Sequence, residues 1–277
     1  MYKVVSTEVI APSVHRLVVE APRVAAARRP GQFVIVRSSA DAERIPLTIA
    51  DADADAGTIT LIVQAIGRGT REIAEVPSGG ALRDVAGPLG EPTEIRRVGR
   101  VVCVGGGVGT AVLFPLAKAL AEAGNEVTTI IGGRSEPFVI LRRELAAFSK
   151  AVLTATEDGS LGVKGFVTAV LAEILADPAR VPAAVYAVGP LPMMAAVAEQ
   201  TRPMGIRTIV SLNPIMIDGT GMCGGCRVTV GGQTKFACVD GPEFDGHQVD
   251  FRELANRQGT YAEHECRLSN ARGENRS

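Results

Sequence analysis

The chain has 277 residues, of which 46% are hydrophobic and 21% charged, and its formal net charge is −1. This length allows about two domains of ~150 residues each. Charges of the two signs are mixed without long blocks, so the sequence lacks the basic stripe typical of nucleic-acid-binding proteins. No apolar run reaches the ~20 residues that a membrane-spanning helix needs. We therefore expect neither a nucleic-acid nor a membrane partner.

The first 20 residues and the five cysteines indicate the cellular compartment of the protein. Residues 1–20 alternate apolar and polar side chains as a strand does, without the continuous apolar stretch of a signal peptide. An odd number of cysteines, three of them bunched at metal-ligand spacing, does not fit a disulfide framework. The expected location is the reducing cytoplasm.

Residues 1–96 are predicted to form an antiparallel β-barrel. Short segments rich in Val, Ile and Thr are separated by Gly, Pro or Asp turns, a pattern typical of all-β domains. One short helix is expected over residues 69–76. The predicted strands are residues 2–10, 14–21, 31–38, 44–51 and 58–65.

Residues 97–212 are predicted to form a doubly wound α/β domain, because strand and helix patterns alternate along them. Gly124 is expected to end the first helix as its C′ residue. The predicted strands are residues 100–107, 125–133, 151–158, 183–190 and 206–212, and the helices are residues 109–124, 141–148, 165–177 and 192–201.

Residues 213–277 are predicted to form a small metal-binding subdomain and a polar tail. A hairpin is expected across Gly231-Gly232, because a two-residue hairpin turn needs positive φ at both positions. The tail is residues 267–277.

A glycine-rich loop joins the first strand and first helix of the α/β domain. Residues without side chains let the backbone approach a pyrophosphate, and the free amides at the helix start face its charge. A tight structural turn is the alternative. The loop residues assigned to nucleotide binding are Gly105, Gly106, Gly107, Val108, Gly109 and Thr110.

Arg134 ends the second strand of this domain, where a dinucleotide's ribose is bound in such folds. It either meets the 2′-phosphate of NADP or is a solvated surface charge, so the choice between NAD and NADP stays open. Gly189-Pro190 forms another strand-to-helix turn at the carboxyl edge, where ligands bind.

Two segments of the barrel carry groups suited to a flavin. Arg44 can pair with a diphosphate, Thr48 can offer its hydroxyl and amide to a flavin ring, and Gly69-Thr70 opens a short helix. Turn glycines and a surface arginine are the alternative interpretation.

These motifs together resemble the ferredoxin–NADP reductase superfamily. The resemblance implies bound FAD and direct hydride transfer with a pyridine nucleotide, without a catalytic side chain. Val188 stands where the superfamily often has a cysteine. The residues that the resemblance assigns to FAD are Arg44, Pro46, Leu47, Thr48, Ile62, Val63, Gly69 and Thr70, and those assigned to the nicotinamide site are Glu157, Asp158, Gly189 and Pro190.

The segment around the three clustered cysteines has the spacing D-x4-C-x2-C-x11-C, given by Asp218, Cys223, Cys226 and Cys238. A ferredoxin-type [2Fe–2S] loop has C-x4-C-x2-C followed by a fourth cysteine, so Asp218 replaces its first thiolate. Two alternatives stay open. Asp218 caps a turn while Cys266 or water completes the site, or the metal is zinc with a fourth ligand among His247, His264 and Cys266.

Nearly the whole chain resembles the electron-transfer subunit of dihydroorotate dehydrogenase. With its Asp, it is more similar to the small subunit of NADH-dependent reduced ferredoxin:NADP oxidoreductase, also labelled a sulfide dehydrogenase subunit. That resemblance implies an oxidoreductase subunit that binds FAD, a [2Fe–2S] cluster and NAD(H), with NADP(H) possible. It also implies a heterodimer with a larger subunit that carries flavin and [4Fe–4S] clusters and bifurcates electrons. Ferredoxin is then an indirect partner of this chain. The alternatives are an NAD-linked dihydroorotate dehydrogenase subunit and a zinc-stabilised nucleotide-binding module.

Overall fold

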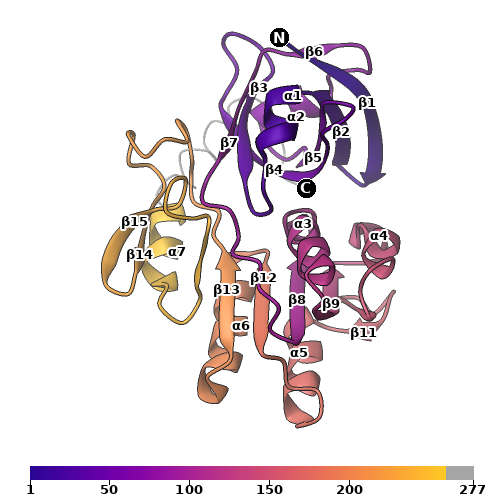
Figure 1. Ribbon diagram of the computed structural model, residues 1–277, viewed down its shortest axis with the longest axis vertical. Coiled ribbons are helices and arrows are strands. Elements are labelled where there is room, and N and C mark those ends of the chain that lie inside the picture. The colour runs from indigo at the N-terminus through magenta and orange to yellow at the C-terminus, as the bar shows by residue number, and fades with distance from the viewer. Residues whose placement is uncertain (260–277) are drawn as a thin grey trace.

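The computed structural model of the chain describes residues 1–259. Figure 1 shows three parts: a barrel formed by the N-terminal strands, a second sheet below it, and a small hairpin segment beside that sheet. No helix within residues 1–259 combines the length and apolar character needed to cross a membrane.

The barrel is a seven-stranded antiparallel sheet with the order β6-β1-β2-β5-β4-β3-β7. Its core includes Leu17, Ile49, Ile59 and Leu61, which are almost completely buried. Five strands and one helix were predicted here, and the structure adds the helix α1 and the strands β6 and β7. The elements are β1 Tyr2–Ala11, β2 Val14–Glu20, α1 Pro22–Ala27, β3 Phe33–Arg37, β4 Ile45–Asp53, β5 Thr58–Gln64, α2 Arg68–Ala74, β6 Ala81–Leu82 and β7 Asp84–Leu89.

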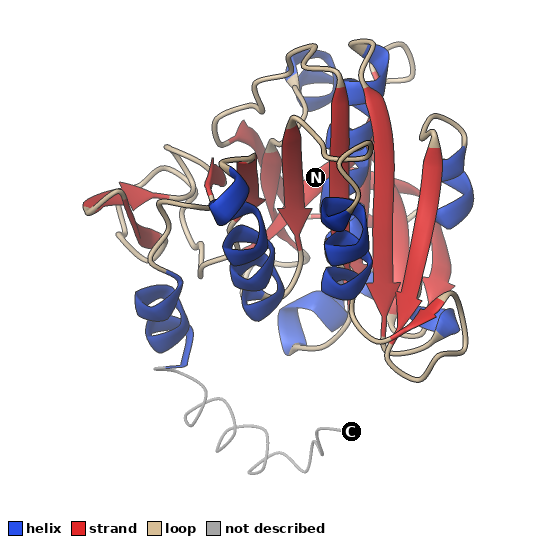
Figure 2. Cartoon of the chain, turned by 90° about the horizontal axis from the view of Figure 1, so that it is seen from below, coloured by secondary structure: helices blue, strands red, loops and turns tan. Residues whose placement is uncertain are grey.

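The second sheet has the order β11-β10-β9-β8-β12-β13-β16, with every neighbouring pair parallel except β13 and β16. Helices lie along its strands (Figure 2). The strand order reverses between β8 and β12, which places a crevice at their carboxyl ends. The elements are β8 Arg100–Gly106, α3 Gly109–Glu122, β9 Glu126–Gly133, η1 Glu136–Phe138, α4 Arg142–Ala146, β10 Ala151–Thr156, β11 Val163–Lys164, α5 Val167–Ala176, β12 Ala184–Val188, α6 Leu191–Thr201, η2 Arg202–Met204, β13 Arg207–Ser211 and β16 Glu243–Asp245.

Two hydrophobic cores cover the two faces of this sheet. On one face, α3 and α4 pack against alternate residues such as Cys103 and Tyr186. On the other, α5 and α6 pack against the intervening residues, such as Val102 and Val185. The predicted fold class, a flavin-type barrel followed by a doubly wound sheet and a small C-terminal segment, is confirmed.

The end of α3 shows the predicted glycine cap. Gly124 has a φ of +84°, its amide donates to the Ala121 carbonyl, and the Asn125 amide donates to the Leu120 carbonyl. These two bonds form a Schellman motif. The cap sets the chain's turn into β9.

The C-terminal segment contains β14 Arg227–Val230, β15 Gln233–Phe236 and α7 Phe251–Gly259. Its hairpin turns at Gly231 and Gly232, both with positive φ, as predicted. The segment shares a core with α6, because Cys226, Cys238 and Leu254 belong to the same buried cluster as Met194 and Val197. Cys266, His264 and the predicted polar tail lie outside the described residues.

Candidate functional site

A cleft of about 880 Å³ lies where the barrel meets the carboxyl edge of the second sheet. Barrel strands β3, β4 and β5 contribute one wall, and the loops after β8, β9 and β12 contribute the other. Ligands bind at this edge in doubly wound folds. The cleft therefore brings together the two segments in which the sequence predicted flavin and nucleotide binding.

Most of the predicted binding residues line this cleft, although they come from segments far apart in the chain. On the barrel side, apolar strand residues and Thr70 of α2 form the wall, and on the other side the glycine loop and two strand-to-helix turns do so. The predicted residues in the cleft are Pro46, Leu47, Thr48, Ile62, Val63, Thr70, Gly106, Gly107, Val108, Gly109, Arg134, Glu157, Gly189 and Pro190.

The glycine loop (residues 105–109) is shaped for close approach. A Cβ added to Gly109 would lie 2.6 Å from the Val188 carbonyl oxygen and 2.7 Å from the Gly189 Cα. Gly107 has a φ of +55° and open space beside it. The amides of Gly107, Thr110 and Ala111 donate to the carbonyls of Gly132, Gly107 and Val108, which leaves the Val108 and Gly109 amides at this helix start for an anion.

Four predicted residues lie next to the cleft without lining it. Thr110 is buried under the loop, where a Cβ on Gly105 would come within 2.9 Å of its Oγ1. A Cβ added to Gly69 would likewise lie 2.9 Å from Cδ1 of Ile45. Asp158 accepts hydrogen bonds from the amide and the hydroxyl of Ser160, and these bonds lower the pKa of its carboxyl. These residues shape the site from behind.

Arg134 lies in the cleft, with its guanidinium carbon 5.0 Å from the centre of the Phe138 ring. A cation held over an aromatic face in this way is favourable. The arrangement fixes a positive charge and an aromatic surface at the end of β9.

Thr70 has a structural partner as well as a place in the cleft. Its Oγ1 accepts from the Gly67 amide at 2.9 Å and donates to the Gly67 carbonyl oxygen at 3.0 Å. The side chain thus caps α2, and its hydroxyl helps to hold the turn that faces the cleft.

Several cleft residues were not predicted. Ile45 lines the cleft in place of Arg44, Phe138 and Phe166 add aromatic surface, and Met193 lies against Gly106 and Gly189. Met193 is half-buried, whereas the neighbouring Met194 is fully buried in the core. Ile45 lines the cleft together with the next three residues, so strand alternation alone does not identify it.

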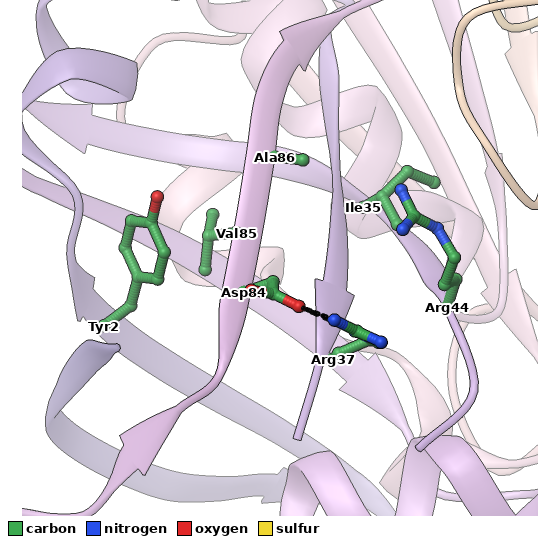
Figure 3. A pocket seen from close by; sticks show the side chains of 7 residues that line it. All are labelled: Tyr2, Ile35, Arg37, Arg44, Asp84, Val85 and Ala86. Carbon is green, nitrogen blue, oxygen red and sulfur yellow. Dashed lines mark hydrogen bonds and ion pairs between the residues drawn. The ribbon is translucent and has the colours of Figure 1, made fainter. Parts of the chain in front are cut away.

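Arg44 lies outside the cleft, in a separate pocket of about 340 Å³ formed with Tyr2, Ile35, Arg37, Asp84, Val85 and Ala86. Figure 3 shows the Arg44 side chain beside Ile35, and Arg37 paired with Asp84. The Nε of Arg44 donates to the carbonyl oxygen of Ile217 at 2.7 Å.

The cysteine loop (residues 217–226) is organised by Asp218. The two carboxylate oxygens accept from the amides of Thr220, at 2.9 Å, and Cys223, at 2.7 Å. These bonds, and one from the Cys223 thiol, lower the pKa of Asp218. The carboxylate is therefore ionised at neutral pH and lies beside the first thiol.

The other two thiols form a second pair. Cys226 and Cys238 are buried, their sulfurs 3.1 Å apart, and the Ala237 amide donates to the Cys226 carbonyl. Burial and the neighbouring thiol raise the pKa of Cys238 to about 12. A thiol in such surroundings loses its proton when a metal replaces it.

The four candidate donors are arranged in two pairs. Within residues 1–259, no three His, Cys, Asp or Glu side chains converge on one point as a single ion requires. The donors form two pairs, Asp218 with Cys223 and Cys226 with Cys238. His247, an alternative fourth ligand, instead bonds to the Thr201 hydroxyl.

A family model and two relatives match the chain. Residues 213–250 match the iron–sulfur cluster binding domain of dihydroorotate dehydrogenase B. A dihydroorotate dehydrogenase B (NAD(+)) electron transfer subunit homolog from Thermotoga maritima is 47% identical over 256 residues, 92% of this chain and 90% of that protein. The dihydroorotate dehydrogenase B electron transfer subunit of Bacillus caldolyticus is 35% identical, over 89% of this chain and 96% of that protein.

Solved structures agree with the sequence relatives. A structure of NADH-dependent reduced ferredoxin-NADP oxidoreductase, described in connection with flavin-based electron bifurcation, matches with a TM-score of 0.91 and 44% identity, over 99% of this chain and 98% of that chain. Phthalate dioxygenase reductase, at 17% identity and a TM-score of 0.60 over 83% of this chain and 85% of that chain, shares the fold. The chain belongs to the family of dihydroorotate dehydrogenase B electron-transfer subunits and their homologues, within the ferredoxin–NADP reductase superfamily, and is an electron-transfer subunit of an oxidoreductase.

Proposed function

We propose that the chain exchanges hydride with NAD(H) at a bound FAD and passes single electrons through a [2Fe–2S] cluster to a larger partner subunit. The observation that carries this proposal is one continuous cleft lined by both the barrel and the glycine loop. Such a cleft holds two ring systems in contact, so position and electrostatics suffice without a catalytic acid or base.

Each part of the chain has a defined task in this proposal. Residues 1–96 bind the flavin and residues 97–212 bind the nucleotide. Residues 213–277 bind the cluster and include the C-terminal tail. Thr48 and the amides of the glycine loop orient the ligands, and the apolar wall formed by Leu47, Ile62 and Val63 excludes water. When bound, FAD supplies the exchange between two-electron and one-electron transfer.

The cysteine loop supports a [2Fe–2S] cluster over zinc. Two donor pairs, formed by the cysteine loop and Cys238 after β15, suit two iron atoms, whereas structural zinc takes four ligands around one centre. Asp218 and Cys223 would hold one iron, and Cys226 and Cys238 the other. Thiol ligands of this kind persist in a reducing compartment, which supports a cytoplasmic location.

A larger partner is supported by the surface around the cysteine loop. Ile215, Ile217, Met222 and Val239 are exposed apolar side chains near the candidate ligands. Clustered exposed apolar residues mark interaction sites. The similarity to the NADH-dependent reduced ferredoxin-NADP oxidoreductase supports a flavin and [4Fe–4S] partner that bifurcates electrons and is coupled to ferredoxin.

The relatives named as dihydroorotate dehydrogenase B subunits support a second candidate, in which the partner oxidises dihydroorotate. The partner that co-purifies decides between the two. A partner with dihydroorotate oxidation activity would overturn the first choice in favour of the second.

The central test is anaerobic purification of the full chain followed by absorption spectroscopy and analysis of flavin, iron, sulfide and zinc. We expect flavin bands with a broad iron–sulfur absorption, and two iron atoms per chain. Cys226→Ser should lose the iron–sulfur absorption and keep the flavin. A colourless protein that contains zinc would contradict both redox functions.

Asp218 is tested as a ligand by three substitutions. Asp218→Cys should keep a cluster with an altered potential, and Asp218→Ala should make the cluster labile. Asp218→Asn separates the two roles, since an amide keeps an acceptor for the loop amides but removes the anionic ligand. Unchanged potential and lifetime in all three variants would show that Asp218 does not bind iron.

Nucleotide preference is tested at Arg134. If Arg134 meets a 2′-phosphate, Arg134→Gln should weaken NADPH binding and leave NADH binding nearly unchanged. We expect the chain to prefer NADH, so that Arg134→Gln alters both affinities by similar small factors. A selective loss of NADPH binding would assign NADP(H) to this subunit.

A further inference from the structure

Arg44 is on the opposite side of the barrel wall from the cleft. The strand β4 begins at Ile45, which points into the cleft, and Arg44 lies in the pocket shown in Figure 3. The next three residues, Pro46, Leu47 and Thr48, also line the cleft, whereas Arg44, just before the strand, lines the other pocket. Arg44 is therefore placed away from a flavin diphosphate in the cleft.

The contact that Arg44 makes instead reaches across the chain. Its Nε donates at 2.7 Å to the carbonyl oxygen of Ile217, a residue 173 positions later. Ile217 immediately precedes Asp218, whose carboxylate caps the Thr220 and Cys223 amides. The hydrogen bond therefore fixes the peptide group that carries a candidate metal ligand.

The barrel holds the same part of the cysteine loop by close packing. Gly219 has a φ of +77°, and a Cβ there would lie 2.6 Å from Cδ1 of Leu89 and 3.1 Å from Cγ1 of Ile35. Ile35 also lines the Arg44 pocket. The outer surface of β3 and β7 and the Arg44 guanidinium thus hold the first half of the loop together.

The charge of Arg44 is not neutralised by a neighbouring carboxylate. Arg37, the other arginine of the pocket, forms an ion pair with Asp84. Within residues 1–259, Arg44 forms no ion pair, and its polar contact is with the neutral Ile217 carbonyl. A net positive charge therefore lies one residue from the loop's first ligand.

We propose that Arg44 is a positioning residue for the iron–sulfur cluster: it fixes the Ile217–Asp218 peptide against the barrel and raises the potential of the cluster with its charge. This inference rests on the proposed [2Fe–2S] function of the cysteine loop. One electron added to the cluster makes it more negative, and a nearby cation favours that reduced form.

Three variants of the full chain separate the bond from the charge. Arg44→Gln removes the charge, Arg44→Lys keeps the charge but lacks the fixed planar donor, and Arg37→Gln removes a cation from the same pocket without touching the loop. The first measurement is the midpoint potential of the cluster, determined in a redox titration that is monitored by electron paramagnetic resonance. The second is the rate of cluster loss to a chelator.

We expect Arg44→Gln to lower the potential and to speed cluster loss severalfold. Arg44→Lys should have a potential close to that of the original chain and an intermediate rate of loss, and Arg37→Gln should change neither. If Arg44→Gln matches the original chain in both, or if Arg37→Gln produces the same change, the inference is wrong. Loss of FAD with an unchanged cluster in Arg44→Gln would return Arg44 to the flavin site.

A third measurement does not depend on the cluster. In metal-free protein, hydrogen exchange of the amides in residues 217–224 should be severalfold faster in Arg44→Gln than in the original chain or Arg37→Gln. Equal exchange rates would remove the positional part of the inference. Absence of iron from the original chain would instead contradict the proposed function, and the exchange measurement would still test the contact.

Discussion

The glycine loop and the cysteine loop are both rich in glycine, but their glycines serve different purposes. In the glycine loop, Gly109 is needed because β12 backbone atoms lie where its side chain would be. In the cysteine loop, Gly219, Gly221 and Gly224 have positive φ and allow the chain to reverse direction. One loop needs glycine for space, and the other mainly for backbone conformation.

The backbone amides of the two loops also differ, in their hydrogen-bond partners. At the start of α3 the Thr110 and Ala111 amides bond to backbone carbonyls of the turn, and the Val108 and Gly109 amides are left for an anion. Amides of the cysteine loop already bond to a carboxylate of the chain itself, that of Asp218. The first site is therefore built by two rigid elements, whereas the second is held by side-chain hydrogen bonds to Asp218.

The largest expected effect tests the need for space at Gly109. Gly109→Ala places a methyl group 2.6 Å from the Val188 oxygen, and the contacting atoms are backbone that cannot rotate away. Overpacking of this kind destabilises by ~1–3 kcal/mol. Displacement of α3 should also weaken NAD(H) binding by about tenfold, which corresponds to ~1.4 kcal/mol. Urea unfolding and a nucleotide titration measure the two effects.

The matched control for this prediction is Gly107→Asn. Gly107 has a φ of +55° with no atom near its Cβ direction, and Asn tolerates this conformation better than other residues. Its effect on the free energy of unfolding should be clearly smaller. Equal losses in the two variants would show that close packing at Gly109 is not what the loop requires.

The second effect concerns the strand that joins the cysteine segment to the sheet. Glu243 of β16 accepts a hydrogen bond from the Thr93 hydroxyl at 2.9 Å, and burial raises its pKa to about 7 from an ordinary value of 4.5. Part of the residue is accessible to solvent, although its carboxyl lies deep among protein atoms. The ionised form is thus disfavoured in the folded chain.

The sign of the pH dependence follows from this raised pKa. Between pH 4.5 and about 7 the folded chain keeps a proton on Glu243 that the unfolded chain has lost. The free energy of unfolding therefore falls as pH rises through this window, by at most about 3 kcal/mol and by less where solvent reaches the carboxyl. Below pH 4.5 the contribution of Glu243 to the free energy of unfolding is fully present, and above about pH 7 it is fully lost.

Glu243→Gln should flatten this part of the pH profile. Denaturant unfolding of the original chain and the variant at several pH values from 4.5 to 8 gives the difference, in which other carboxyls cancel. A parallel pair of profiles would show that Glu243 titrates normally. A large difference between the two profiles would show that the stability of the chain depends on the contact between Glu243 and Thr93, which lies between β7 and β8.

Sequence periodicity predicted most elements of five or more residues, but it missed α1 and β7, with six residues each, and α7, with nine. It was insufficient for β6, β11 and β16, which have two or three residues and depend on the neighbours they pair with. The doubly wound topology followed from alternation alone. The antiparallel addition of β16 did not, since a three-residue strand contains no signal for direction.

For the candidate site, motifs identified the segments better than the side chains. The motif around Pro46 located one wall of the cleft, yet a shift of one residue decides that Ile45 rather than Arg44 lines it. Phe138, Phe166 and Met193 enter the cleft only when distant segments pack together. Metal-ligand spacing predicted the four donors, but their arrangement as two pairs needed coordinates.

A smaller effect tests the side-chain hydrogen bonds beside Cys238. The carboxylate of Asp240 accepts from the Phe236 amide at 2.7 Å and holds the turn that carries this cysteine. Asp240→Ala should destabilise metal-free protein by ~1 kcal/mol, the net value of such a bond. Thermal unfolding measures it, with Asp240→Asn as the control that retains an acceptor. Equal losses in both variants would indicate a role for the charge.

The smallest expected effect is the counterpart of Gly109→Ala in the cysteine loop. A Cβ on Gly225 would lie 3.4 Å from the Ile215 carbonyl oxygen and 3.6 Å from the Cys223 sulfur, which are ordinary contacts. Gly225→Ala should therefore change the free energy of unfolding by no more than about 0.5 kcal/mol. The same substitution thus has different consequences at the two positions, because Gly109 faces backbone atoms at close range and Gly225 does not. If Gly225→Ala leaves metal-free stability unchanged but loses iron, the loop must contract when loaded, and Gly225 would then be needed for space, as Gly219 is against Leu89.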